Sequence, residues 1–165
     1  MLTCHELMGF MSPELAAEIV SSTYENDREL YKATLTSVAE ARKVRSVFLQ
    51  RQPREKRDRT VVQTLARPNM EMVAGALLRG WLIKNHQDLL ETFLTSLGIE
   101  HNEGMVEDLP DQVDDDKVNA AVEKILENNT PEVVAVYLHA FNSMNDTRWE
   151  NLDEILASDE RLQLA

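Results

Sequence analysis

The side chains of this sequence that could most readily support nucleophilic, acid–base or metal chemistry are one cysteine and four histidines. Cys4 and His5 are adjacent, whereas a cysteine nucleophile and its histidine base normally meet through the fold. We therefore interpret them as ordinary residues near a frayed N-terminus. His86 and His101 lie near acidic residues, but no pair of them has the spacing of metal ligands. The sequence thus predicts no metal site and no cofactor.

The fourth histidine, His139, lies within residues 133–141, which are apolar at nearly every position. A buried imidazole needs a hydrogen-bond partner, and it could also serve as a proton donor or a ligand. One interpretation is a structural histidine in the core or at the edge of a helix. The other is an enzyme with an unrecognised site near His139. We favour the structural interpretation and predict no catalytic residues.

Motifs for nucleotide, zinc or calcium binding are missing from the sequence. The five glycines are dispersed and form no phosphate-binding loop. His5 and Glu6 begin like a zinc-protease helix, but Gly9 stands where the second histidine ligand is required. A run of aspartates at residues 114–116 begins like a calcium loop, yet Asn119 and Ile125 occupy the positions of its glycine and glutamate. These activities are not expected.

A basic segment spans residues 42–67, with nine Lys or Arg and two acidic residues. Around Pro53, a helix–proline–helix corner could present several cations to carboxylates or phosphates. The alternatives are a solvated corner or one neutralised by the chain's own acidic residues. Phe48 is the only aromatic residue near these cations, which weakens a single-strand binding hypothesis. The candidate partner-binding residues are Arg42, Lys43, Arg45, Arg51, Arg54, Lys56, Arg57 and Arg59.

The overall composition indicates an acidic protein of 165 residues with a net charge of −12. Residues 98–165 carry seventeen acidic and four basic residues, so the two ends of the charge distribution oppose each other. A single cysteine excludes an internal disulfide and fits a reducing compartment. No signal peptide or membrane-spanning run is visible, so we expect a soluble, cytoplasmic protein that does not bind membranes.

Helical patterns account for nearly all of the remaining chain. Ser12-Pro13 and Thr130-Pro131 both combine an N-cap hydroxyl with proline at the first helical position. The apolar spacing predicts hairpins at about residues 12–50, 69–97 and 130–157, with one long helix continuing to about Gln50. A short basic helix is expected at about residues 55–66, and an acidic loop at about residues 99–114.

These elements predict an all-α protein with a single domain over residues 1–165. Seven or eight helices would form antiparallel hairpins, in a bundle or a short stack similar to an α-solenoid. The hairpins begin at unequal intervals, so we do not expect a strict internal repeat.

We expect an intracellular interaction or adaptor domain without catalytic activity, with self-association as one form of that role. The alternative is nucleic-acid binding through the basic segment, and an enzyme with a site near His139 is a third hypothesis. A protein partner or a second copy of the chain is the favoured partner, and nucleic acid is the less favoured one.

Overall fold

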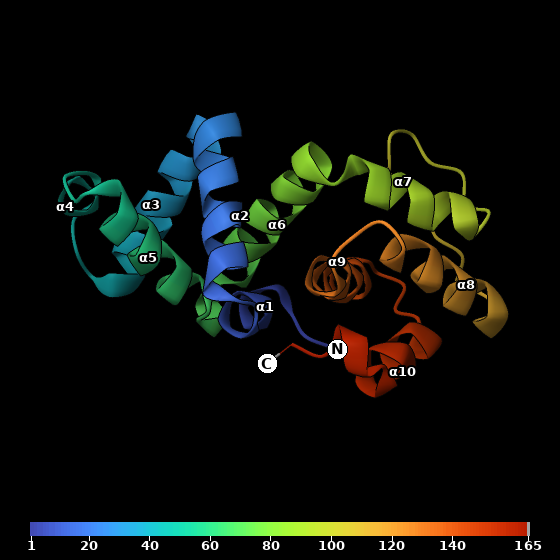
Figure 1. The fold of residues 1–165 in the computed structure, drawn as a ribbon. Helices are drawn as coiled ribbons and strands as arrows, with labels where there is room; N and C mark the ends of the chain where they lie inside the picture. Colours follow the sequence, from blue (N-terminus) through green and yellow to red (C-terminus); the bar gives the residue numbers. More distant parts are fainter. Residues whose placement is uncertain (165) are drawn as a thin grey trace. The chain divides into compact units, whose positions relative to one another are not determined.

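The computed structural model describes residues 1–164 (Figure 1). In this part of the chain the backbone forms ten α-helices, two 3₁₀ turns and no β-strand, which confirms the all-α prediction with more helices than expected. The elements are α1 (Cys4–Phe10), α2 (Pro13–Asn26), α3 (Arg28–Arg42), α4 (Ser46–Gln50), α5 (Arg54–Leu65), η1 (Pro68–Met70), α6 (Glu71–Asn85), α7 (Gln87–Ser96), α8 (Asp115–Leu126), α9 (Pro131–Met144), α10 (Glu150–Ser158) and η2 (Glu160–Leu162).

Local capping explains why the main helices begin where the sequence predicts. The Ser12 hydroxyl accepts a hydrogen bond from the Leu15 N–H at 3.2 Å, and the Thr130 hydroxyl accepts one from the Val133 N–H. At the start of α3, the Asp27 carboxylate accepts a hydrogen bond from the Leu30 N–H. Each bond satisfies one of the N–H groups that a helix start leaves without an intrahelical partner.

The expected frayed N-terminus is wrong, because residues 4–10 form the ordered helix α1. Thr3 and Glu6 make a capping box, a pattern that the sequence contains as Thr-x-x-Glu. The Glu71 carboxylate accepts hydrogen bonds from the N–H groups of Cys4 and His5, both at 2.8 Å. Cys4 is consequently buried, with 1% of its surface exposed.

We expected a single domain. The contacts group the described residues into two compact units, and the boundary between the units falls within α6. One unit comprises Thr3–Trp81, and the other comprises Leu82–Leu164 together with Met1–Leu2. We call them the N-terminal unit and the C-terminal unit, and describe each by itself.

In the N-terminal unit, α2, α3 and α5 pack against one another, and α1 packs on α5. Trp81, at the end of this unit, is buried and donates its indole N–H to the Glu18 carboxylate at 3.2 Å. The core side chains follow the predicted apolar stripes of α2, α3 and α5. They include Ile19, Val20, Leu35, Val38, Val61 and Leu65.

In the C-terminal unit, α9 is the central helix, as its nearly uniform apolar sequence predicts. Residues 133–140 are all buried, because α8, α10 and η2 pack around the helix. An aromatic cluster joins it to α7 and to the start of α10, with Phe93 and Tyr137 in edge-to-face contact at 5.5 Å. Phe141 lies against both Phe93 and Trp149.

Asn142 lies inside α9, shortly before the turn into α10. Its amide is 1% exposed and makes three hydrogen bonds to the start of α10. Asn142 accepts from the Trp149 N–H at 2.9 Å and donates to the Trp149 carbonyl at 3.0 Å and the Asp153 carboxylate at 2.7 Å. Asn142 therefore fixes the second helix of the hairpin from inside the first.

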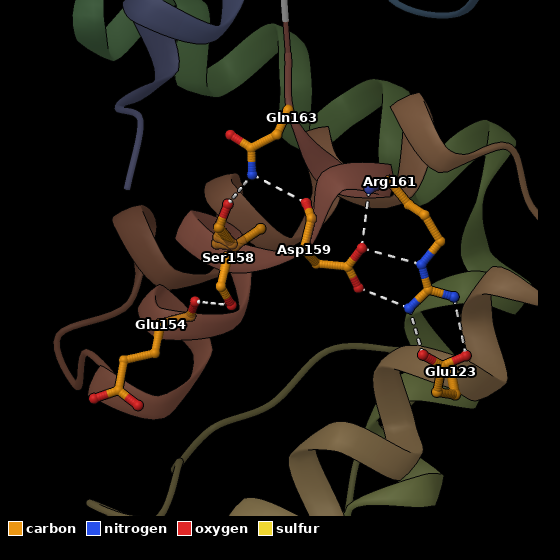
Figure 2. A network of polar contacts seen from close by, with 7 residues as sticks. Glu123, Glu154, Ser158, Asp159, Arg161 and Gln163 are labelled. Atoms are coloured by element: carbon orange, nitrogen blue, oxygen red, sulfur yellow. Dashed lines mark hydrogen bonds and ion pairs between the residues drawn. The ribbon is translucent and has the colours of Figure 1, made fainter.

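Polar contacts attach the end of the described chain to α8 and α10 (Figure 2). The Arg161 guanidinium donates to both the Asp159 and the Glu123 carboxylates. Gln163 donates to the carbonyls of Leu156 and Asp159 at 2.8 and 3.0 Å. Leu162, which lies between Arg161 and Gln163 in the sequence, is completely buried. The turn η2 therefore contributes an apolar side chain to the core of the C-terminal unit, and the polar contacts of its neighbours hold the turn in place.

Residues 99–114 form the predicted loop without helical structure. A tight turn at its start brings Asn102 and Met105 into backbone pairing. Gly104 has φ +84°, and a Cβ added there would meet Leu90 at 2.8 Å, so this position requires glycine.

Candidate interaction surface

The basic segment begins with a break that the sequence analysis did not predict. The expected helix to Gln50 is wrong, because α3 ends at Arg42 and Lys43 adopts left-handed backbone with φ 56°. The N–H groups of Lys43 and Val44 turn back to carbonyls of the last turn of α3. This is the geometry of a helix C-terminus closed by a left-handed residue. The chain then resumes in the five-residue helix α4.

This break turns three apolar side chains outward. Val44 and Phe48 belong to the stripe that the sequence predicts to be buried, yet they are 39% and 58% exposed, and Val47 is 48% exposed. Only Leu49 of α4 points into the core, with 1% of its surface exposed. We call Val44, Val47 and Phe48 the apolar tip. Contiguous exposed apolar side chains of this kind mark interaction sites more often than scattered ones do.

Four of the eight predicted partner-binding cations flank the apolar tip in the sequence and have no polar partner among the described residues. Their side chains are exposed and make no hydrogen bond or ion pair with residues 1–164. These four are Lys43, Arg45, Arg51 and Lys56. Together with the apolar tip they form what we call the basic corner.

The other four predicted cations are used inside the N-terminal unit. Arg42 donates to the Thr64 hydroxyl at 3.2 Å, and Arg57 donates to the Tyr31 hydroxyl at 2.7 Å. Arg54 and Arg59 both lie on α5. Arg54 bonds Ser21, pairs with Asp58 and covers the Tyr24 ring at 3.8 Å, while Arg59 pairs with Glu55 at 3.5 Å.

Tyr31 is the centre of the contacts that hold α5 against α3. Its hydroxyl donates to the Asp58 carboxylate at 2.6 Å while it accepts from Arg57. Burial, together with the hydrogen bond to Asp58, raises the pKa of Tyr31 to about 12. The phenol thus stays protonated at neutral pH. These contacts fix the position of α5, the helix that carries Lys56 of the basic corner.

A groove also runs between α2 and α5 in the N-terminal unit, with a volume of about 530 Å³. Its rim carries Arg54 and Arg59, but Asp58 and Glu55 pair with them. The rim is therefore electrically balanced and gives no preference for a charged ligand. The apolar lining comes from Pro13, Ala17 and Val62.

A second groove, in the C-terminal unit, is acidic. It lies where the end of the loop meets α10 and has a volume of about 370 Å³. Trp149 donates to the Pro110 carbonyl at 2.9 Å, and Asn151 donates to the Val113 carbonyl at 2.7 Å, so the loop is fixed against the helix. The lining residues are Asp111, Gln112, Val113, Asp115, Arg148, Trp149, Glu150, Asn151 and Glu154.

Three carboxylates of this acidic groove have no internal partner. Asp111, Glu150 and Glu154 are exposed and make no side-chain hydrogen bond or ion pair with the described residues. The one arginine of the lining, Arg148, is neutralised by Asp153. The groove thus presents net negative charge.

The histidines make contacts that hold the backbone. His139 is buried, and its Nδ1 accepts a hydrogen bond from the Leu2 N–H at 2.9 Å. His5 pairs with Glu71, and His101 accepts from the Gly104 N–H within the loop turn. The two grooves described above do not include His139. The hypothesis of an enzyme site near His139 gains no support from this contact.

Residues 1–164 contain no group of three or more Cys, His, Asp or Glu side chains arranged to hold a metal ion. Over the same residues, none of the helices combines the length and the apolar character needed to cross a membrane. Comparisons of the chain with protein-family models, with curated proteins and with solved structures give no match.

Proposed function

We propose that this protein is an interaction domain that binds a protein partner through the basic corner. The observation that carries the proposal is the coincidence of the exposed apolar tip with four cations that have no internal partner. By contrast, Arg54 and Arg59 of the same basic segment pair with carboxylates of α5.

The chemistry of the basic corner defines the surface that it would bind. Burying an apolar side chain such as Phe48 contributes about 1.5–3 kcal/mol, so a hollow on the partner that removes the tip from water favours binding. The surrounding cations contribute orientation and association rate when they face carboxylates. A partner surface with a hollow bordered by acidic residues satisfies both conditions.

Photo-crosslinking tests this proposal directly. The photoreactive residue p-benzoylphenylalanine is placed at Phe48 and, as a control, at Met72, which is 89% exposed on α6 outside the basic corner. We expect irradiation in a lysate of the native cells to give a defined protein adduct from position 48 only. Arg45→Glu with Arg51→Glu should abolish that adduct. Identical adducts from both positions, or none from position 48, would overturn the proposal.

Nucleic acid is the second candidate partner, because an exposed Phe48 could stack on a base while the free cations contact phosphates. The net charge of −12 opposes this function. Fluorescence anisotropy with single-stranded RNA tests it. Four phosphate contacts would give a slope of about −3 for log K against log salt. The variant to compare is Arg45→Glu with Arg51→Glu, because Arg54 and Arg57 hold the fold.

A further inference from the structure

We infer that the partner fitting the basic corner is a second copy of this chain, bound through its acidic groove. The inference rests on the proposed function and identifies the occupant of the same surface. The corner belongs to the N-terminal unit and the acidic groove to the C-terminal unit. One copy would therefore contribute its corner, and the next copy its groove.

The two surfaces are complementary in charge. Lys43, Arg45 and Arg51 on one copy have no internal partners, and neither do Glu150 and Glu154 on the other. Each set is exposed and loses no existing ion pair when it meets the other. Association therefore gains pairing without breaking contacts of the fold, which is the condition under which interfacial charges favour binding.

The acidic groove is large enough to receive a side chain of the apolar tip. It has a volume of about 370 Å³, within the range of about 300–1,000 Å³ typical of pockets that receive organic groups. Its lining is mainly polar, with Val113 and Trp149 among the lining residues. Phe48 is the most exposed member of the apolar tip and is the side chain that we place in the groove.

The balanced groove between α2 and α5 is a poorer receptor for the corner. Its Arg54 and Arg59 would face the cations of the incoming tip, and its acids already have partners. Like charges facing each other across an interface disfavour association. The acidic groove is the receptor that the charges select.

Because the corner and the acidic groove are different surfaces, the contact is heterologous. Contacts of this type repeat from copy to copy and give rings or open chains instead of a closed two-fold dimer. The net charge of −12 on every copy opposes assembly. We therefore expect a dissociation constant in the range of about 10–100 μM.

Sedimentation velocity with two charge-reversal variants tests the inference. The corner variant is Arg45→Glu with Arg51→Glu, and the groove variant is Glu150→Lys with Glu154→Lys. We expect the wild-type sedimentation coefficient to rise with concentration and each variant to remain monomeric. Mixing the two variants should restore association, because every corner then meets a groove of opposite charge.

The groove variant separates this interface from nonspecific charge effects. Its two changes bring the net charge of −12 closer to zero by four charges, so weaker general repulsion would increase association instead of abolishing it. A matched control for the corner variant is Lys32→Glu with Arg79→Glu, which makes the same charge change at exposed positions outside both surfaces. The control should associate like the wild type.

A wild-type protein that stays monomeric at about 100 μM would overturn the inference, and so would a variant mixture that stays monomeric. Either result leaves the proposed function intact if Phe48 still crosslinks to another protein. A corner variant that associates as strongly as the wild type would also overturn the inference. Circular dichroism of each variant confirms that the helices are retained.

Discussion

At the scale of single residues, polar side chains that the sequence does not single out hold the helices in place. Asn142 fixes the start of α10 from inside α9, and Glu71 fixes the start of α1 from α6. Each makes several hydrogen bonds to backbone groups that would otherwise lack intrahelical partners. Both have larger structural roles than the histidines that first draw attention in the sequence.

Replacement of Asn142 should strongly destabilise the protein. Asn142→Leu removes two buried hydrogen bonds and one partly buried one, and it leaves the Trp149 N–H unsatisfied, so we expect a loss of about 2–3 kcal/mol in the free energy of unfolding. Chemical denaturation measures the loss. The control Asn69→Leu changes an exposed asparagine on η1 and should stay within about 0.5 kcal/mol of wild type. Equal effects would contradict the role given to Asn142.

Replacement of Glu71 should destabilise the protein in a pH-dependent manner. Burial raises the pKa of this carboxyl, but hydrogen bonds from His5 and Cys4 outweigh that effect and hold the pKa below its usual value. A lowered pKa means that the stabilisation is complete above the usual value and is lost as the pH falls through the folded-state pKa. Glu71→Gln should therefore cost about 1–2 kcal/mol at pH 7.

Denaturation of wild type and the Glu71→Gln variant in parallel from pH 7 to pH 3 measures this dependence. The difference between the two proteins should shrink below the usual glutamate pKa of about 4.3. Taking the difference cancels the titration of the other carboxylates. A cost that stays constant over this range would contradict the assignment.

At the scale of elements, the break between α3 and α4 creates the basic corner. The apolar spacing of Val38, Val44 and Phe48 fits a continuous helix, which is why the sequence predicts one to Gln50. Lys43 in left-handed backbone ends that helix, and α4 then buries Leu49 in place of Phe48. One residue's backbone conformation thus decides which apolar side chains face solvent.

Glycine substitution at Lys43 should have the opposite sign from glycine substitution elsewhere in the same region. Lys43→Gly removes the steric cost of the left-handed conformation and should stabilise the protein by about 0.5–1 kcal/mol. Lys32→Gly, inside α3, should destabilise it by about 1 kcal/mol. Thermal and chemical denaturation of both variants test the pair. Destabilisation by both would contradict the helix end at Arg42.

At the scale of the whole molecule, opposite charges are segregated between the two contact units. The basic segment belongs to the N-terminal unit, whereas the acidic loop and the acidic groove belong to the C-terminal unit. Part of the charge in each unit is used internally, as Arg57 and Arg161 illustrate. The two surfaces assigned to association carry charged side chains that have no internal partners.

The C-terminal unit should depend on the last described residues of the chain. Leu162→Ala empties a completely buried position and should cost about 2–4 kcal/mol. Arg161→Gln should cause a smaller loss that diminishes at high salt, because the pairs with Asp159 and Glu123 are partly exposed. Hydrogen exchange of residues in α8 and α10 measures both effects. Equal protection in wild type and the Leu162→Ala variant would contradict the anchoring role given to Leu162.

The sequence by itself determines the all-α class and the starts of the main helices, because caps and apolar spacing act within one or two turns. Thr130 with Pro131 and Ser12 with Pro13 place the helix starts correctly, and α9 is recognisably central. The charge count of residues 42–67 identifies the basic segment, whose nine Lys or Arg include the eight predicted partner-binding residues. The capping box of Thr3 and Glu6 was equally local and would have revealed α1.

Only the tertiary structure decides which of those residues are available to a partner. Arg54 and Arg57 are engaged by Tyr24 and Tyr31, which come from other helices, while Arg45 has no internal partner. Local pattern cannot separate these cases, because pairing depends on side chains far apart in the sequence. The exposure of Phe48 and the assembly of the acidic groove likewise depend on packing between elements, so the candidate interaction surfaces become visible only in the folded chain.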